Sequence, residues 1–155
     1  MTDEQIAAQT NETRKHIARV GVLCDQAAFA VIARGRDHDA SKLEDPEAEA
    51  FARMTPILKT LTYGTPEYKA SLADLGPALQ HHYENNRHHP EFHKDGVRDM
   101  TLIDLVEMLA DWKASSERVK GGSIAASLPQ QKVRFKISDD LYAVLENTCR
   151  AMGWE

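Results

Sequence analysis

The sequence contains only two cysteines, Cys24 and Cys149, among its 155 residues. They stand far apart and form no Cys-x-x-Cys pair, which argues against a disulfide framework or a zinc finger and predicts two reduced thiols. Long hydrophobic runs are also missing, because the longest, residues 27–33, is far shorter than the ~20 residues that cross a membrane. The first residues are polar and lack the apolar core of a signal peptide. These absences predict a cytoplasmic protein without a membrane segment.

An excess of positive charge is missing as well. The chain has 19 Lys and Arg against 24 Asp and Glu, for a net charge of −5. Broad nucleic-acid binding depends on a basic surface, so it is not expected here, whereas a small anionic ligand remains compatible if a metal or local cations offset the field. Hydrophobic residues make up 42% and charged residues 28%, as in soluble globular proteins. We therefore expect one folded domain over residues 1–155.

The spacing of apolar residues predicts an all-α fold of about five or six helices. Apolar positions recur at intervals of three and four, and Ser, Thr, Asp, Pro and Gly stand where helices begin and end. One five-residue stretch, 133–137, alternates like a strand, after a connecting segment at 123–132 and a loop at 91–99. A turn is expected at Tyr63-Gly64. The expected helices cover residues 6–33 (closed by Gly35), a short one from 38, 46–61, 65–87, 102–120 (ended by Gly121-Gly122) and 138–152.

Histidines are concentrated in one short segment. Five of the seven histidines lie between residues 81 and 93. On a helix, positions 81, 85 and 88 share one face and positions 82, 86 and 89 share another, so either register presents two histidines and an asparagine together. The segment predicts a local metal site, although a solvent-exposed histidine-rich helix end is the plain alternative.

Three other regions supply side chains that can bind a metal. His16 lies on the inward row of the first helix, His38-Asp39 stands at a helix start, and Asp111 sits among apolar neighbours in the helix 102–120. A carboxylate in such surroundings needs a cation or strong donors to offset its desolvation, although periodicity alone does not separate Asp111 from Asp104. Imidazole and carboxylate ligands together suit Mn, Fe, Co, Ni or Zn rather than calcium.

The order His16, His38-Asp39, a histidine pair and Asp111 resembles the H…HD…D pattern of the HD-domain superfamily of metal-dependent phosphohydrolases. His38-Asp39-Ala40-Ser41-Lys42 is similar to its HD-x-x-K form, and Leu109-Ala110-Asp111 is similar to its last ligand helix. Over nearly its whole length the chain also resembles an uncharacterised, phage-associated family of small HD-like proteins. The resemblance implies an HD-type helical domain that binds one or two divalent transition-metal ions. The implied metal ligands are His16, His38, Asp39 and Asp111, joined in two-metal members by His81 or His82 with His88 or His89.

The same resemblance implies a hydrolase that acts on nucleotides, of the deoxynucleoside triphosphate triphosphohydrolase or 5′-nucleotidase type. A metal would lower the pKa of a bound water that attacks phosphorus. Lys42 would stabilise charge on the phosphate oxygens, and Glu44 or a histidine behind the ligands would carry the proton. Side-chain chemistry makes Asn85, with Tyr83, Asn86 and Arg87, a candidate substrate contact, because amide and phenol groups can read a base or sugar and Arg can bind phosphate; Arg118 is a further candidate for phosphate binding.

Several alternatives stay open. The chain lacks the Gly-Tyr-Pro of cyclic-dinucleotide phosphodiesterases of this superfamily, yet a phosphodiesterase of a cyclic or signalling nucleotide is the nearest alternative. The surplus of histidines would also suit a di-iron oxygenase of HD type. A third alternative is a non-enzymatic binding module that a metal stabilises, or an accessory protein that docks on a host factor. A homo-oligomer through Val22, Phe29 and Ile32 of the first helix is open too, although a domain core is the commoner role of such residues.

Overall fold

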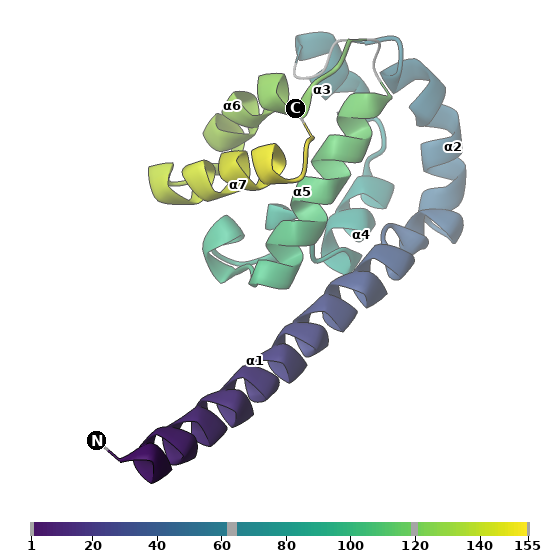
Figure 1. Ribbon diagram of the computed structural model, residues 1–155. Coiled ribbons are helices and arrows are strands. Elements are labelled where there is room, and N and C mark those ends of the chain that lie inside the picture. Colours follow the sequence, from purple (N-terminus) through teal and green to yellow (C-terminus); the bar gives the residue numbers. More distant parts are fainter. Residues whose placement is uncertain (1, 62–64, 119–120, 155) are drawn as a thin grey trace. The chain divides into compact units, whose positions relative to one another are not determined.

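The computed structural model describes residues 2–61, 65–118 and 121–154, and within them the chain is all-helical with no strand. The all-α prediction is confirmed. Seven α-helices occur in these ranges, more than the five or six expected, together with three 3₁₀ helices (Figure 1). The α-helices are α1 (Asp3–Asp37), α2 (Glu47–Leu58), α3 (Pro66–Ala73), α4 (Pro77–Asn85), α5 (Leu102–Glu117), α6 (Ile124–Phe135) and α7 (Asp139–Ala151), and the 3₁₀ helices are η1 (Ala40–Leu43), η2 (Pro90–Phe92) and η3 (Gly96–Asp99).

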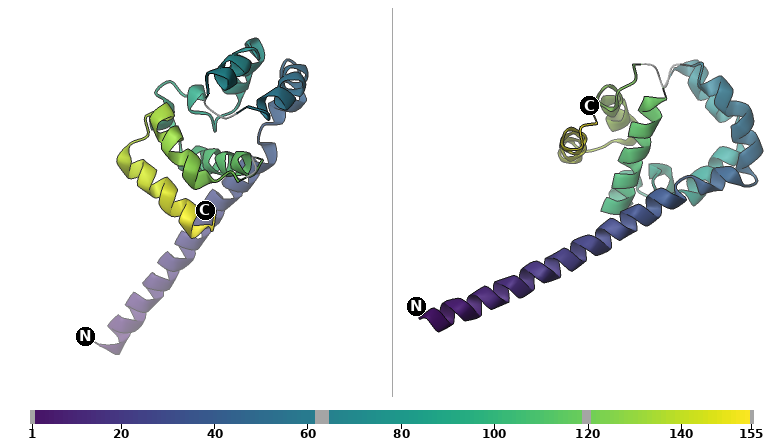
Figure 2. Two further views of the ribbon diagram at one scale, coloured as in Figure 1. Left: turned by 90° about the horizontal axis from the view of Figure 1, so that it is seen from above. Right: turned by 45° about the vertical axis from the view of Figure 1, so that its right-hand side comes forward.

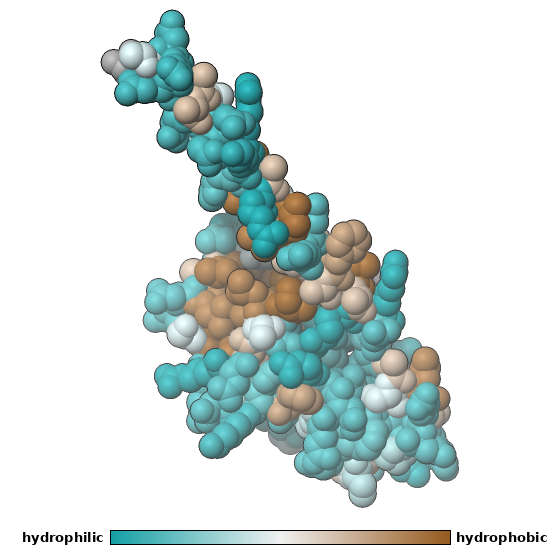
Figure 3. Space-filling view, turned by 90° about the horizontal axis from the view of Figure 1, so that it is seen from below, coloured by the Kyte–Doolittle hydropathy of each residue, from teal (hydrophilic) through white to brown (hydrophobic). Residues whose placement is uncertain are grey.

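The chain divides into two units, Met1–Arg36 and Asp37–Glu155. The first unit is α1, a single long helix in which no residue is buried. Acidic residues in its first turn and basic residues in its last turn complement the helix dipole. Figure 3 shows hydrophilic residues over the first turns of α1 and hydrophobic residues further along it; the exposed ones include Ile17, Val20, Leu23 and Phe29. The helix continues through Gly35, so the expected stop at that residue is wrong.

The helical run that contains α1 is long and apolar enough to cross a membrane, judged by length and composition alone. It is the single such run among the described residues. The sequence-based expectation counted only uninterrupted apolar residues, whereas an average over 18 residues tolerates isolated charges. Core helices of soluble proteins and signal sequences meet the same criterion, so the cytoplasmic location stays a prediction.

The hydrophobic core of the second unit lies where α5, α6 and α7 meet. Met108 and Leu109 of α5 pack with Ile124 and Leu128 of α6 and with the α7 residues Leu145 and Cys149. Figures 1 and 2 show α6 and α7 on one side of α5, with α2 and α4 on the other. The core therefore fixes α5 as the central element of this unit.

The long helix expected at 65–87 is two helices, α3 and α4. The predicted start is correct, because the Thr65 side chain accepts a hydrogen bond from the Tyr68 backbone N–H and Pro66 occupies the first turn. The break comes at Gly76-Pro77. Gly76 has a φ of 51°, which glycine adopts readily, and Pro77 has no N–H to continue the helix. The consequence is that α4 is short and carries His81 and His82 near its end.

Residues 124–135 form one helix, α6, so the connector expected at 123–132 and the strand expected at 133–137 are both wrong. α6 begins at Ile124 after Ser123 and contains Pro129 in its interior. The alternation of apolar and charged residues at 133–137 predicted a strand with its apolar residues on one face. In the structure Val133 is an exposed residue of α6, whereas Ile137 lies just beyond the helix and is buried. By contrast, the last helix begins after Ser138, whose side chain caps the Leu141 N–H, as expected.

The remaining boundaries are close to the predictions. α2 begins at Glu47 after Pro46 but ends at Leu58, before the expected 61. Thr101 and Asp104 form a capping box at the start of α5, which ends at Glu117, before Gly121-Gly122. The expected turn at Tyr63-Gly64 lies outside the described residues, and the expected loop at 91–99 contains η2 and η3.

Candidate metal centre

His38 and Asp39 lie where α1 ends and the short helix η1 begins. The expected helix start is thus a 3₁₀ helix, with Asp39 as its N-cap residue at φ 55° and ψ 19°. Aspartate tolerates this left-handed conformation better than most residues, and non-glycine residues that adopt it cluster at functional sites. Asp39 also accepts a 2.6 Å hydrogen bond from Lys42 Nζ. The turn therefore holds the carboxylate of Asp39 between its own 3₁₀ helix and the histidines.

The end of α4 and the turn after it bring three histidines to the Asp39 carboxylate. His82 lies on α4, while His88 and His89 follow Asn86, whose extended backbone ends the helix. The Nε2 atoms of His82 and His88 lie 3.4 and 3.5 Å from Asp39 Oδ1. His82 Nε2 and His89 Nε2 are 2.8 Å apart. The four side chains form one group whose ligating atoms all lie within 4.8 Å of one another.

Asp111 of α5 completes a second group with His38 and His88. His38 Nε2 lies 3.6 Å from Asp111 Oδ1 and 3.4 Å from Asp39 Oδ2. His88 belongs to both groups, and Asp39 faces His38 with one oxygen and His88 with the other. Four imidazoles and two carboxylates thus converge from three parts of the second unit: the η1 turn, the segment 82–89 and α5. We call this set the histidine-carboxylate cluster; its members are His38, Asp39, His82, His88, His89 and Asp111.

Glu107, one helical turn before Asp111, contacts two of these imidazoles. Its Oε1 lies 3.0 Å from His38 Nδ1, which donates a hydrogen bond to it, and 3.1 Å from His88 Nδ1. Because Nδ1–H of His38 points at the carboxylate, Nε2 is the nitrogen of that ring that faces the cluster and can bind a metal once its proton leaves. The carboxylate is buried, with 8% of the residue exposed.

Glu47, the first residue of α2, does the same for the other side of the cluster. It is fully buried, and its two oxygens lie 2.7 Å from His81 Nδ1 and 2.9 Å from His82 Nδ1. Ser41 Oγ donates a further hydrogen bond to Glu47 at 3.0 Å. Asn86 Nδ2 in turn donates to Ser41 at 2.7 Å and to the His82 carbonyl at 2.8 Å. The orientation of His82 is therefore set by a network of buried hydrogen bonds.

The charges of the cluster differ from one imidazole to the next. Hydrogen bonds to Asp111 and Glu107 raise the pKa of His38 to about 10, so this ring is protonated at neutral pH. Burial lowers the pKa of His89 to about 3 and also lowers that of His82, so both rings are neutral. Burial opposes the ionisation of Asp39, yet the charge and hydrogen bond of Lys42 hold its pKa below its usual value. The Asp111 carboxyl is likewise opposed by burial, but its hydrogen bond with His38 lowers its pKa.

Three buried atoms of the cluster have no hydrogen-bond partner within the described part of the chain: Asp39 Oδ1 and both ring nitrogens of His88. Two of them, Asp39 Oδ1 and His88 Nε2, face each other at 3.5 Å. An ionised carboxylate oxygen that is buried without a donor is costly. A divalent cation would satisfy both atoms at once, and the mixed nitrogen and oxygen donor set suits Mn, Fe, Co, Ni or Zn. The residues present therefore fit a transition metal.

Metal binding is expected to release a proton from His38. Because its imidazole must lose the proton that a pKa of about 10 keeps there, affinity should rise by about tenfold per pH unit between pH 6 and 8. Calorimetric titration of Mn²⁺ or Zn²⁺ in buffers of different ionisation enthalpy measures the release. Glu107→Gln, which removes the charge of one acceptor of His38, should reduce it. A binding constant independent of pH would show that His38 is not a ligand.

The structure brings together most of the predicted metal ligands. His38, Asp39, His82, His88 and Asp111 meet in the cluster. His81 faces Glu47 instead and belongs to neither group. His16 is an exposed residue of α1, in the first unit, and is also outside both groups, so its role as a ligand stays a prediction.

The predicted catalytic and substrate-binding residues are placed less uniformly. Lys42 lies against Asp39, at the centre, whereas Glu44 and Arg118 are exposed. Asn85 donates to the His81 carbonyl at 2.8 Å. Arg87 forms two 3.2 Å hydrogen bonds with the buried Asp104, which ties the end of α4 to the start of α5. The substrate contacts assigned to these residues stay predictions.

Sequence reasoning named His89 only as an alternative to His88 and gave Glu47 and Glu107 no ligand-orienting role. Both histidines belong to the cluster. Glu107 could have been found from its position, because it precedes Asp111 by four residues on the same helix and so shares its face. Glu47 carries no such local signal. Its partners His81 and His82 lie 34 and 35 residues further along the chain.

Comparison with known proteins gives a family but no activity. A family model described as a family of unknown function (DUF5662) matches residues 5–151, nearly the whole chain. Neither the curated proteins nor the solved structures contain a match.

Proposed function

The chain belongs to DUF5662, a family of unknown function, and we propose from its histidine-carboxylate cluster that it is a metal-dependent phosphohydrolase acting on nucleotides. The observation that carries the proposal is the convergence of four imidazoles and two carboxylates, with two of the rings, His38 and His82, held through Nδ1 by two buried glutamates. Metal-binding histidines in enzymes are oriented in this way by carboxylates behind them. The H…HD…D order of the ligands, which resembles the HD-domain superfamily, supports the same assignment.

The cluster divides into two sets that share His88 and could hold one or two ions. Asp39, His82, His88 and His89 form one set, and His38 and Asp111 join His88 in the other. A divalent metal bound there would supply Lewis acidity and a water of lowered pKa, which is the nucleophile that phosphate hydrolysis requires. Hydrolysis forms a bond between the water oxygen and phosphorus and breaks the bond to the leaving oxygen, while one proton leaves the water and one reaches the leaving group.

Two residues beside the cluster suit the remaining tasks. Lys42 places its ammonium 2.6 Å from Asp39 Oδ2, where it can also neutralise charge that develops on phosphate oxygens. His81 is half-exposed and donates to the same buried glutamate as His82. An imidazole between this network and solvent is suited to carry a proton. We assign Lys42 to the binding of phosphate and His81 to proton transfer.

The experiment that tests the function is a product analysis. Protein loaded separately with Mn²⁺, Co²⁺, Zn²⁺ or Fe²⁺ is incubated with deoxynucleoside mono- and triphosphates, and the products are separated by chromatography. We expect nucleoside with phosphate or with tripolyphosphate, in reactions that stop on chelation and resume when metal is restored. Tight metal binding without turnover of any nucleotide would overturn the proposal.

The donor set also supports a second candidate, a di-iron oxygenase. The cluster holds four imidazoles beside its two carboxylates. Four nitrogen ligands are more than a hydrolytic ion needs, and imidazole suits iron. Iron-loaded protein would then consume oxygen in the presence of an organophosphonate or a polyol. An oxygen electrode separates the two candidates, because the hydrolase consumes no oxygen.

A further inference from the structure

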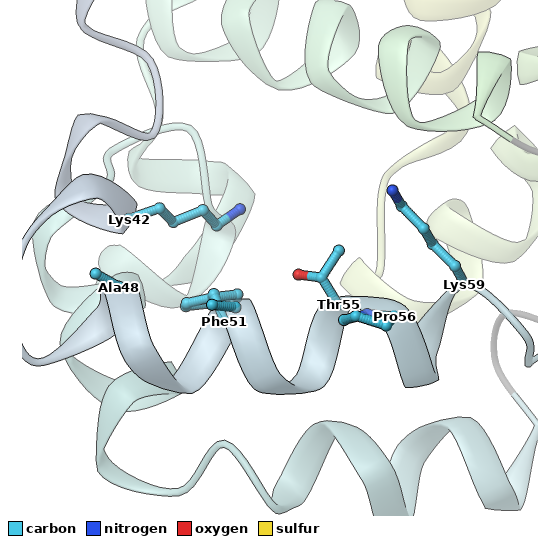
Figure 4. A pocket seen from close by; sticks show the side chains of 7 residues that line it. Lys42, Ala48, Phe51, Thr55, Pro56 and Lys59 are labelled. Atoms are coloured by element: carbon cyan, nitrogen blue, oxygen red, sulfur yellow. The ribbon is translucent and has the colours of Figure 1, made fainter.

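An open groove runs along α2 beside the histidine-carboxylate cluster, and the proposed chemistry at the cluster leaves most of it without a role. Figure 4 shows Lys42 at one end of this α2 groove and Lys59 at the other, with Phe51, Thr55 and Pro56 between them. Lys42 is shared with the cluster, because its ammonium contacts Asp39 at 2.6 Å. The groove therefore starts at the candidate metal centre.

The groove has a polar end, an apolar floor and a second polar end. The Lys42 ammonium lies 4.9 Å from the centre of the Phe51 ring. Phe51, Ala48 and Pro56 form the floor, and Thr55 adds a hydroxyl. From Phe51 to Lys59 the helix advances by about 12 Å at 1.5 Å per residue. Within the described ranges no carboxylate pairs with Lys59, so its charge faces solvent at the far end.

We propose that the α2 groove holds the nucleoside part of the substrate and that Lys59 selects guanine, uracil or thymine, the bases with a carbonyl oxygen where adenine and cytosine carry an amino group. The inference rests on the proposed function for one point, the placement of the phosphate at the metal centre beside Lys42. The base then lies on the Phe51 side of the groove, and its far edge reaches Thr55 and Lys59.

The chemistry of Lys59 gives the selectivity its direction. A lysine ammonium has three donors and no acceptor. Guanine presents O6 and N7 as acceptors, whereas adenine presents an amino group at the equivalent position; uracil and cytosine differ in the same way. When an amino group faces the ammonium, both groups are donors and neither finds an acceptor in the other. The apolar floor makes no such distinction, because every base can stack on an aromatic ring.

The experiment compares the binding of matched nucleotides by titration calorimetry. Manganese-loaded protein is titrated with guanosine and adenosine 5′-monophosphates and with uridine and cytidine 5′-monophosphates, at a temperature and time at which turnover is measured in parallel. The variants are Lys59→Met, which keeps the length of the side chain without the ammonium, and Lys94→Met as a control at an exposed position between η2 and η3. Phe51→Leu reduces the aromatic floor.

We expect roughly tenfold tighter binding of the guanine and uracil nucleotides over their amino partners, as for one hydrogen bond to a charged group. Lys59→Met should remove this ratio and Lys94→Met should keep it. Phe51→Leu should weaken all four nucleotides and leave the ratio unchanged. A ratio near one in the original protein, or an unchanged ratio in Lys59→Met, overturns the groove assignment.

The parallel turnover measurement separates this inference from the proposed function. Selective binding without hydrolysis supports the groove and overturns the hydrolase. Hydrolysis of all four nucleotides with no Lys59-dependent ratio supports the hydrolase and overturns the groove. No binding of any nucleotide to the metal-loaded protein overturns both.

Discussion

Replacing Asp39 with alanine is expected to remove metal binding and hydrolysis while the chain stays folded. Asp39 stands between the two ligand sets: Oδ1 faces His82 and His88 at 3.4 and 3.5 Å, and Oδ2 faces His38 at 3.4 Å. Mutation of a residue that hydrogen-bonds to a metal ligand typically lowers metal affinity or activity by 10–100-fold. Loss of a carboxylate that belongs to one set and faces His38 of the other should therefore cost more than about 100-fold. Metal analysis of the purified variant and the product assay measure the two effects.

The backbone at Asp39 requires a second variant and a matched control. Its φ of 55° strains alanine, whereas asparagine tolerates this region well. Asp39→Asn keeps the shape and the backbone but removes the charge, and it should also lose activity. Asp37→Ala changes an exposed carboxylate two residues earlier and should keep both metal and activity. If Asp39→Ala retains full metal content and full hydrolysis, the cluster is not the active site.

The helical class and the HD turn were predictable because local chemistry determines them. Thr101 and Ser138 cap their helices as their sequence context predicts. The break at Gly76-Pro77 was readable too, from a proline that cannot continue a helix, but the prediction extended the helix from its start at Thr65 through both residues. The alternation at 133–137 resembled a strand and 123–132 resembled a connector, and only packing against α7 and α5 identifies α6 as part of the core.

The identity of the ligands was less predictable, because it depends on distant contacts. Asp104 and Asp111 lie on one helix and could not be separated by periodicity. The structure separates them: Asp104 caps α5 and binds Arg87, while Asp111 contacts His38. The choice between His81 and His82 likewise depends on Glu47, which is far away in sequence. Short-range patterns indicated which residue types can bind metal, and tertiary contacts determine which of these residues converge.

Glu47→Gln is expected to weaken metal binding by roughly 10–100-fold, the range for partners that orient ligands. The carboxylate accepts from His81 through one oxygen and from His82 and Ser41 through the other. An amide keeps one acceptor oxygen and turns the other position into a donor. In either orientation of the amide, its NH₂ faces groups that donate to Glu47 in the original protein. If it faces His82, the ring must accept at Nδ1 and carry its proton on Nε2, where it can no longer bind a metal.

Glu107→Gln should weaken metal binding less than Glu47→Gln. This contrast tests whether the direction of the imidazole protons, rather than charge, governs the site. Glu107 presents a single oxygen, Oε1, to both rings: it accepts a hydrogen bond from His38 Nδ1 and lies 3.1 Å from His88 Nδ1. A glutamine can present its one acceptor to both rings without reversing either, so Glu107→Gln loses charge but keeps both orientations.

Glu49→Gln, at an exposed position two residues after Glu47 on α2, serves as the control and should match the original protein. Dissociation constants for Mn²⁺ from calorimetry, with circular dichroism as a check on folding, should rank the variants Glu49→Gln, Glu107→Gln and Glu47→Gln in order of increasing loss. Equal losses for the two buried glutamates would show that charge, not the direction of the imidazole protons, governs the site.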